Sequence, residues 1–146
     1  MKKLVTTVVV LMLAGVVYAQ SGQSTIEKQK FNLSKEGEDN AGYAQAVKAG
    51  NTIYISGTVA GGDMATALTK VYDRLQQTLA AYGATFQNVV KENLYTTDID
   101  EVKKHTDVRK KYYKGDWPAA TWVQIQRLYS PNASLEIELV AVLPDK

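Results

Sequence analysis

The segment from residue 118 to residue 143 constrains the fold more than any other part of the chain. Its pattern predicts two strands, residues 120–128 and 134–142, joined by a turn at Ser130-Pro131-Asn132. Because successive side chains of a strand point to opposite faces, the segment divides into two sets. The apolar set predicts the core face and comprises Val123, Ile125, Leu135, Ile137 and Leu139. The other set is typical of a cleft wall or a subunit interface and comprises Ala120, Trp122, Gln124, Glu136 and Glu138.

The first residues have the features of a secretory signal peptide. Lys2 and Lys3 precede an apolar run over residues 4–17, and the small residue Ala19 follows shortly after. A membrane-spanning helix would need roughly 20 apolar residues and a flanking anchor, which this run lacks. We therefore expect export to the periplasm or the medium with cleavage after Ala19, and residues 1–19 are excluded from the fold.

The remaining length predicts a single domain, with an N-terminal segment at residues 20–40 and the main domain at residues 41–146. Without Lys2 and Lys3, the 17 basic residues fall to 15, which equals the 15 acidic residues. This near-neutral charge argues against a protein that binds nucleic acids or anionic membranes in general. Since the chain has no cysteine, disulfides, a thiol nucleophile and a thiolate metal site are excluded.

Alternation and helical periodicity predict the other elements. A possible edge strand at residues 27–33 and a charged turn at 34–40 precede a hairpin of residues 43–48 and 52–56, a connection at 57–63, a helix at 63–82, a strand at 88–97 and a surface helix at 100–114. This order predicts an α+β fold in which helices cover one face of a mixed or antiparallel sheet. The other face, with Tyr43, Tyr54 and Trp122, needs cover, and a homo-oligomer would supply it.

Three groups of polar residues are candidates for carrying chemistry. Glu136 and Glu138 point to the same face of one strand, so either could position or deprotonate a water in a half-dry cleft beside Trp122. They could equally form an ion pair or hydrogen bond with a neighbouring subunit. The single histidine, His105, lacks a recognisable frame of acid and nucleophile and is expected on the surface. The basic run at residues 103–114 could bind phosphates, but a solvated helix face is the simpler interpretation.

Several stretches together resemble the RidA family, which is also called the YjgF or liver perchloric acid-soluble protein family. Residues 43–57, with the sequence YAQAVKAGNTIYISG, resemble its N-terminal signature. Later blocks resemble the family in the same order: Val89-Val90-Lys91, Thr97-Asp98-Ile99-Asp100, Pro118-Ala119 and Leu135-Glu136-Ile137-Glu138. The resemblance extends over about residues 40–142 and rests on no single motif.

This resemblance implies a chorismate-mutase-like fold that assembles as a homotrimer with ligand clefts between its subunits. Active family members hydrolyse reactive 2-imino or enamino acids to 2-keto acids and ammonia. An arginine clamps the substrate carboxylate, while a glutamate, a tyrosine and main-chain groups orient the imine and the water. The resemblance implies neither a cofactor nor a metal, and the partners expected are a small-molecule ligand and further copies of the chain.

The residues of the family's site fall on specific positions of this chain. By resemblance, the tyrosine falls on Tyr43, the serine on Ser56 and the water-positioning glutamate on Glu136. The arginine falls on Ala120, within an otherwise fitting Pro118-Ala119 frame. Loss of a charge-assisted bidentate contact removes about 1.5 to 3 kcal/mol of binding and much of the substrate's orientation. We therefore expect efficient 2-imino-acid deamination to be absent.

Three functions follow from these features. The favoured one is an exported trimer whose clefts bind a small molecule other than a free 2-imino acid, with Trp122 and Tyr43 as apolar walls, Glu136 as a polar contact and space left by Ala120. The second is residual imine or enamine deaminase activity through Glu136 and Tyr43. The third, an endoribonuclease and translation inhibitor, is disfavoured by the charge and by the isolated His105. A chaperone-like role has no sequence feature that tests it.

Overall fold

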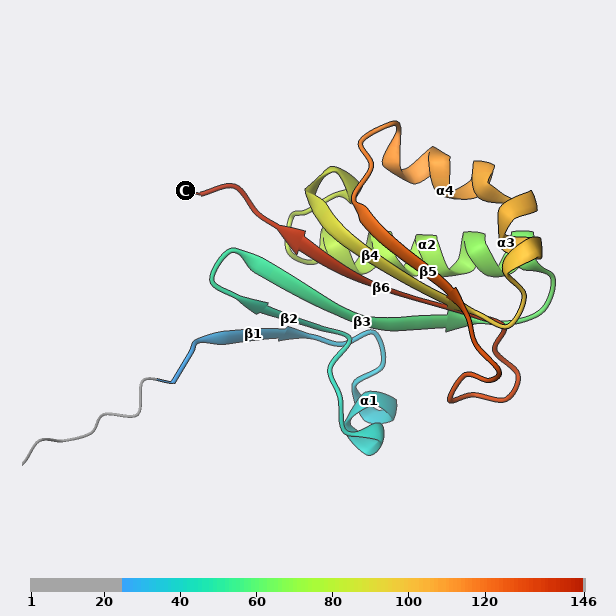
Figure 1. Ribbon diagram of the computed structural model, residues 1–146. Helices are drawn as coiled ribbons and strands as arrows, with labels where there is room; N and C mark the ends of the chain where they lie inside the picture. Colours follow the sequence, from blue (N-terminus) through green and yellow to red (C-terminus); the bar gives the residue numbers. More distant parts are fainter. Residues whose placement is uncertain (1–24, 146) are drawn as a thin grey trace, which may run out of the picture.

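The computed structural model describes residues 25–145 (Figure 1). The predicted signal peptide, residues 1–19, lies outside the described residues. Along the chain, the elements are β1 (Lys28–Phe31), α1 (Lys35–Ala41), β2 (Ala46–Ala49), β3 (Thr52–Ala60), α2 (Met64–Ala80), a 3-10 turn (Phe86–Asn88), β4 (Val89–Thr96), α3 (Ile99–Lys104), α4 (Thr106–Tyr113), β5 (Ala119–Gln124) and β6 (Leu135–Val142). No helix within this range has the length and apolar character needed to cross a membrane.

The strands form one mixed sheet in the order β1-β2-β3-β6-β4-β5. Strands β4 and β5 are parallel, and the other neighbouring strands of the sheet are antiparallel. Helix α2 packs behind the sheet, chiefly against β3, while α1 projects away from it (Figure 1). The fold is α+β, as the sequence predicts, but the described part of the chain contains four helices. Residues 35–41 form α1 where a turn was expected, and the predicted second helix is divided at His105 into α3 and α4.

Helix α2 forms for the reasons visible in its sequence. The Asp63 side chain caps the first turn by accepting from the backbone N–H groups of Ala65 at 3.1 Å and Thr66 at 3.5 Å. Gly83 follows the helix with a φ of 71°, a conformation that glycine adopts without steric cost. The predicted apolar stripe packs against the sheet in the core and includes Leu68, Val71, Tyr72, Leu75 and Leu79.

Strand β6 supplies the centre of the core, as its alternation predicts. Leu135 and Ile137 are fully buried and Leu139 is 2% exposed. The prediction for the preceding strand was wrong in part, because β5 ends at Gln124 and Val123 is 37% exposed. The physical reason is that β4 lies between β5 and β6 and pairs Val123 with Tyr95, which places Val123 on the side of the sheet that the helices leave open.

The predicted face that Trp122 would share with Glu136 and Glu138 is also wrong. The parallel register sets Trp122 beside buried Leu94, on the side of the sheet covered by helices. Glu136 and Glu138 are paired with Tyr95 and Asn93, on the open side. Alternation shows which residues of one strand share a face of the sheet. It does not show which faces of two strands coincide, because that depends on the long connection and on the strand inserted between them.

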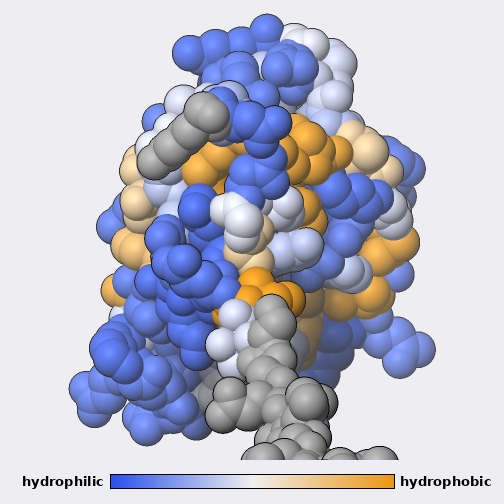
Figure 2. All heavy atoms as spheres, turned by 90° about the vertical axis from the view of Figure 1, so that its left-hand side faces the viewer, coloured by the Kyte–Doolittle hydropathy of each residue, from blue (hydrophilic) through white to orange (hydrophobic). Residues whose placement is uncertain are grey.

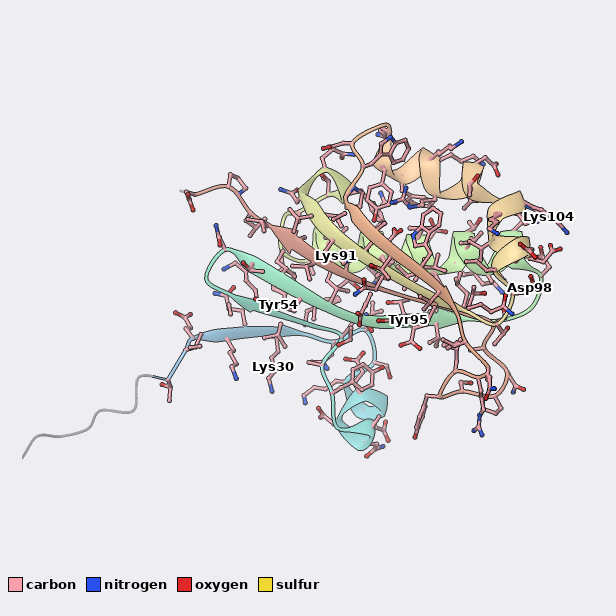
Figure 3. All side chains as sticks on the ribbon, in the orientation of Figure 1. Lys30, Tyr54, Lys91, Tyr95, Asp98 and Lys104 are labelled. Atoms are coloured by element: carbon pink, nitrogen blue, oxygen red, sulfur yellow. The ribbon has the colours of Figure 1, made fainter. Side chains whose placement is uncertain are left out.

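The open face of the sheet carries aromatic and charged side chains. Tyr54 from β3, with 55% of its surface exposed, and Lys91 and Tyr95 from β4 lie along it (Figure 3). Figure 2 views the molecule from one side and shows hydrophobic residues exposed among hydrophilic ones. Within the described residues, no element covers this face.

Candidate functional site

A hollow of about 410 Å³ opens where α1 and the loop between β5 and β6 project beyond the sheet (Figure 1). Its lining comes from four segments of the chain and comprises Ala41, Tyr43, Ser56, Gly57, Val59, Tyr129, Ser130 and Glu136. The structure therefore brings together Tyr43, Ser56 and Glu136, which the sequence named as site residues. Ala120 and Trp122 do not line this hollow.

A β-bulge in β3 forms the floor of the hollow. The register between β3 and β6 shifts between Ile55 and Thr58, so that Ser56 and Gly57 occupy the bulge. The Glu136 side chain lies directly over Gly57: a Cβ atom at position 57 would be 1.8 Å from Glu136 Oε1. A glycine is therefore required for the carboxylate to occupy this place.

The two glutamates of β6 have different environments. Glu138 Oε1 accepts hydrogen bonds from Asn93 Nδ2 at 2.7 Å and from the Tyr95 hydroxyl at 3.1 Å. No side chain or backbone group among residues 25–145 donates a hydrogen bond to the carboxylate of Glu136, in contrast to that of Glu138. Burial, and then repulsion from Glu138, raise the pKa of Glu136 above its ordinary value. Glu138 is thus held in place, while the Glu136 carboxylate is available to a ligand or a water.

Tyr43 forms one wall of the hollow and is 45% exposed. Burial raises the pKa of its hydroxyl, and the charges of Glu38 and Glu136 raise it further. The Ser56 hydroxyl donates to the carbonyl of Ala44 at 2.8 Å. This hydrogen bond holds the backbone beside Tyr43 in place. The Ser56 oxygen can still accept a hydrogen bond from a ligand.

Glu38 holds α1 against the sheet and was not recognised from the sequence, which indicated only a charged turn. It is 3% exposed and accepts from the backbone N–H groups of Leu33 and Ser34, both at 2.8 Å, and of Gln45 at 2.9 Å. Burial alone would raise the pKa of Glu38, but these bonds and one from the Asn32 side chain together lower it. Glu38 therefore adds a fixed negative charge behind Tyr43.

On the other side of the sheet, the carboxylate of Glu92 is fully buried and saturated with donors. Arg109 Nε and Trp122 Nε1 donate to its Oε1 at 2.8 and 2.9 Å. The hydroxyls of Tyr113 and Tyr72 donate to its Oε2 at 2.7 and 3.1 Å. Trp122 is therefore part of a buried network and not of the hollow.

The guanidinium of Arg109 is enclosed by aromatic rings. Its Cζ atom lies 4.4 Å from the ring centre of Tyr113, 5.1 Å from that of Trp122 and 5.3 Å from that of Trp117. Since every partner belongs to the same chain, this cluster fastens α4 to β4 and β5. No local sequence pattern indicates this cluster, because Arg109 and Glu92 belong to different elements.

The remaining candidates contribute no site. His105 lies at the junction of α3 and α4, and its Nε2 is 3.9 Å from Glu101. In the part of the chain that the structure describes, no three His, Asp or Glu side chains are grouped to hold a metal ion. The chemistry of the hollow therefore rests on Glu136, two tyrosines and serine hydroxyls.

Comparisons with known proteins show what the chain as a whole is similar to. Residues 33–143 match the model of the family described as endoribonuclease L-PSP. A 2-iminobutanoate/2-iminopropanoate deaminase from Rattus norvegicus is 31% identical over 129 residues, which cover 82% of this chain and 93% of the relative. The Homo sapiens protein with the same name is 33% identical over 68% of this chain and 79% of its own length.

Solved structures give the same result for the fold. A crystal structure of a YjgF/YER057c/UK114 family member from Mycobacterium tuberculosis aligns with a TM-score of 0.74 and 27% identity. The alignment covers 80% of this chain and all of the other chain. The fold is thus that of the YjgF proteins.

Proposed function

Because this chain belongs to the endoribonuclease L-PSP family, which includes proteins named as 2-imino-acid deaminases, we propose that it is a RidA-like binding protein. It is exported, assembles as a homotrimer and binds a small metabolite in clefts between its subunits. It does not deaminate 2-imino acids efficiently.

One observation carries this proposal. The hollow keeps Tyr43, Ser56 and Glu136 together, but none of its lining residues is an arginine or a lysine. Ala120, where the resemblance places the arginine, offers only a methyl group. A substrate carboxylate would therefore lack the bidentate, charge-assisted hydrogen bonds from an arginine that orient it. The site has a hollow shape and the polar carboxylate of Glu136, both of which suit ligand binding, but it lacks the arginine that would hold an imino acid.

The position of Ala120 supports a site shared between copies. Ala120 is paired with Glu92, so it lies on the opposite side of the sheet from Glu136 of the same chain. All of β5 is exposed, and β5 is an edge strand that could approach another subunit. In a trimer, position 120 of one copy would be the one to approach the hollow of the next.

The test is a ligand screen on the purified protein with its oligomeric state known. Sedimentation equilibrium should give a trimer. A metabolite that binds in the cleft should raise the melting temperature of the natural protein and raise it less in Glu136→Gln. A panel that includes acids, amines and neutral compounds but produces no such shift would remove the proposal.

Export is proposed from the charge and apolar run of residues 2–19 alone. The protein should be found outside the cytoplasm, with Gln20 as its first residue. Protein sequencing from fractionated cells tests this. A cytoplasmic protein that begins at Met1 would contradict it.

A second candidate is an imine or enamine deaminase with an altered substrate. It is favoured by the Glu136 carboxyl, because burial and Glu138 raise its pKa, which is the direction that acid–base catalysis near neutral pH requires. In this alternative Glu136 positions the attacking water and Tyr43 orients the imine. If Glu136→Ala and Tyr43→Phe leave ammonia release from an enamine substrate unchanged, this candidate is wrong.

A further inference from the structure

We infer that the ligand of the hollow is an organic cation, an amine or a quaternary ammonium group, held between Tyr43 and Tyr129 with Glu136 as its counter-ion. This inference rests on the proposed function, because it names the ligand class of the same site. Three properties of the hollow support it: the aromatic walls, the charge, and the packing contacts that hold the loop carrying Tyr129 against the sheet.

The aromatic walls come from two parts of the chain. Tyr43 follows α1, and Tyr129 comes from the loop between β5 and β6. Tyr129 is 95% exposed in the single chain, so its ring takes no part in packing the fold. A ring face that is accessible beside a carboxylate attracts cations through its quadrupole, and quaternary ammonium groups are commonly recognised in this way.

The loop that carries Tyr129 is fastened to the sheet on both sides of this residue. Leu128, immediately before it, is 5% exposed. After it, the backbone N–H of Ser134 donates to the carbonyl of Ala60 at 2.9 Å. A Cβ atom on Gly61 would lie 1.9 Å from the carbonyl oxygen of Asn132, so the loop backbone packs directly against this glycine. The backbone on both sides of Tyr129 is therefore held against the sheet, which positions the Tyr129 ring at the hollow.

The charges that act on Glu136 and Tyr43 are all carboxylates. Glu136 lines the hollow, Glu138 raises the pKa of Glu136, and the charge of Glu38 acts on Tyr43. Arg74 lines an adjoining hollow of about 550 Å³ that shares Tyr43 and Tyr129 with this one. Its Nη1 donates to the carbonyl of Val59 at 3.1 Å, and the charge that shifts the pKa of Glu136 comes from Glu138. The environment around Glu136 therefore repels a carboxylate ligand and attracts a cation.

A bound cation would also stabilise the charged form of Glu136, which burial and Glu138 disfavour. Its carboxylate is partly desolvated beside Glu138, and a bound cation would offset both the lost hydration and the repulsion. The oxygens of Ser56 and Ser130 line the same hollow and could accept from the N–H groups of a primary amine. Cation recognition thus uses the carboxylate, the rings and the hydroxyls together.

The experiment is an NMR titration of the full protein with three small probes. Choline provides the cation, 3,3-dimethylbutan-1-ol has the same shape without the charge, and 2-oxobutanoate is an anion. Choline should shift the amide signals of Tyr43, Gly57 and Tyr129, with a Kd about tenfold or more below that of the neutral probe. Glu136→Gln and Tyr129→Ser should each weaken choline binding by about tenfold.

Glu27→Gln is the matched control, because it removes the same charge from an exposed position outside the hollow. It should leave choline binding unchanged. If the neutral probe or 2-oxobutanoate binds the same residues as tightly as choline, the cation inference is wrong while a cleft that binds metabolites stands. If choline shifts signals equally in Glu136→Gln, the inference is also wrong. If no probe of any charge affects these signals, the cation inference is wrong, while the proposed function is decided separately by the metabolite panel.

Discussion

The carboxylate of Glu136 lies in the space that a side chain on Gly57 would fill. Its Oε1 atom is 1.8 Å and its Cδ atom 2.7 Å from the position of a Cβ on residue 57. The bulge in β3 brings the Gly57 backbone into this place, and Glu136 on β6 lies over it. Residue 57 therefore determines where the carboxylate of Glu136 can lie.

Gly57→Ala should displace this carboxylate without unfolding the protein. The clash involves the end of a flexible side chain, so the free energy of unfolding should change by less than about 1 kcal/mol. Ligand binding in the hollow should fall by about tenfold or more, because its counter-ion has moved. Urea unfolding and a binding titration measure the two effects. Unchanged binding would contradict the role given to this glycine.

Glu136→Gln should increase stability at neutral pH. The pKa of Glu136 is raised above 4.5, since burial and Glu138 disfavour its charge, so the folded state is penalised when this carboxyl ionises. The penalty is absent below the unfolded pKa of 4.5 and complete above the raised folded pKa. Tyr43 and Tyr95 also face this group, and both have raised pKa values that keep them neutral at these pH values. Urea unfolding of both proteins at about pH 4 and pH 7 tests this, and a variant less stable at pH 7 would contradict it.

Glu38→Gln should have the opposite effect. The pKa of Glu38 is lowered, so its stabilisation is present above the ordinary value of 4.5 and is lost as the pH falls through the folded pKa. Charge-assisted bonds to three backbone N–H groups would be weakened, at a cost of about 1.5 to 3 kcal/mol at neutral pH. The loss should shrink in acid. A loss of stability that does not depend on pH would show that the charge of Glu38 is unimportant.

Glu92→Ala should be among the most destabilising single changes. It would leave Arg109 buried without its partner, at a cost of about 3 to 5 kcal/mol. Tyr113→Phe removes only one neutral donor from the same carboxylate and should cost about 1 kcal/mol. Equilibrium unfolding in urea separates the two variants. Equal losses would contradict the central place of Glu92 in the network.

Much of the fold could be predicted from local patterns. The cap at Asp63, the end of α2 near Gly83 and the core face of β6 each depend on residues close together in the sequence. The position of β5 could not be predicted, because it depends on β4 being inserted beside β6. The predicted face of Trp122 was wrong for that reason.

The candidate site was predictable where the resemblance supplied it, at Tyr43, Ser56 and Glu136. Tyr129 was missed, since an aromatic residue in a loop has no periodicity that marks it as part of a wall. Glu92 and Arg109 were missed because each looks like an ordinary surface charge until the packing of α4 brings them together. Pairs of this kind depend on long-range contacts, which one sequence does not reveal.

Ammonia release from a freshly generated 2-imino acid, by the natural protein and by Ala120→Arg, tests the proposed function most directly. The natural protein should release no more ammonia than the uncatalysed reaction. Ala120→Arg should gain activity if assembly brings position 120 of one copy to the hollow of another. Efficient release by the natural protein, abolished in Glu136→Ala, would contradict the proposal, because it would show that the hollow deaminates imino acids without the arginine.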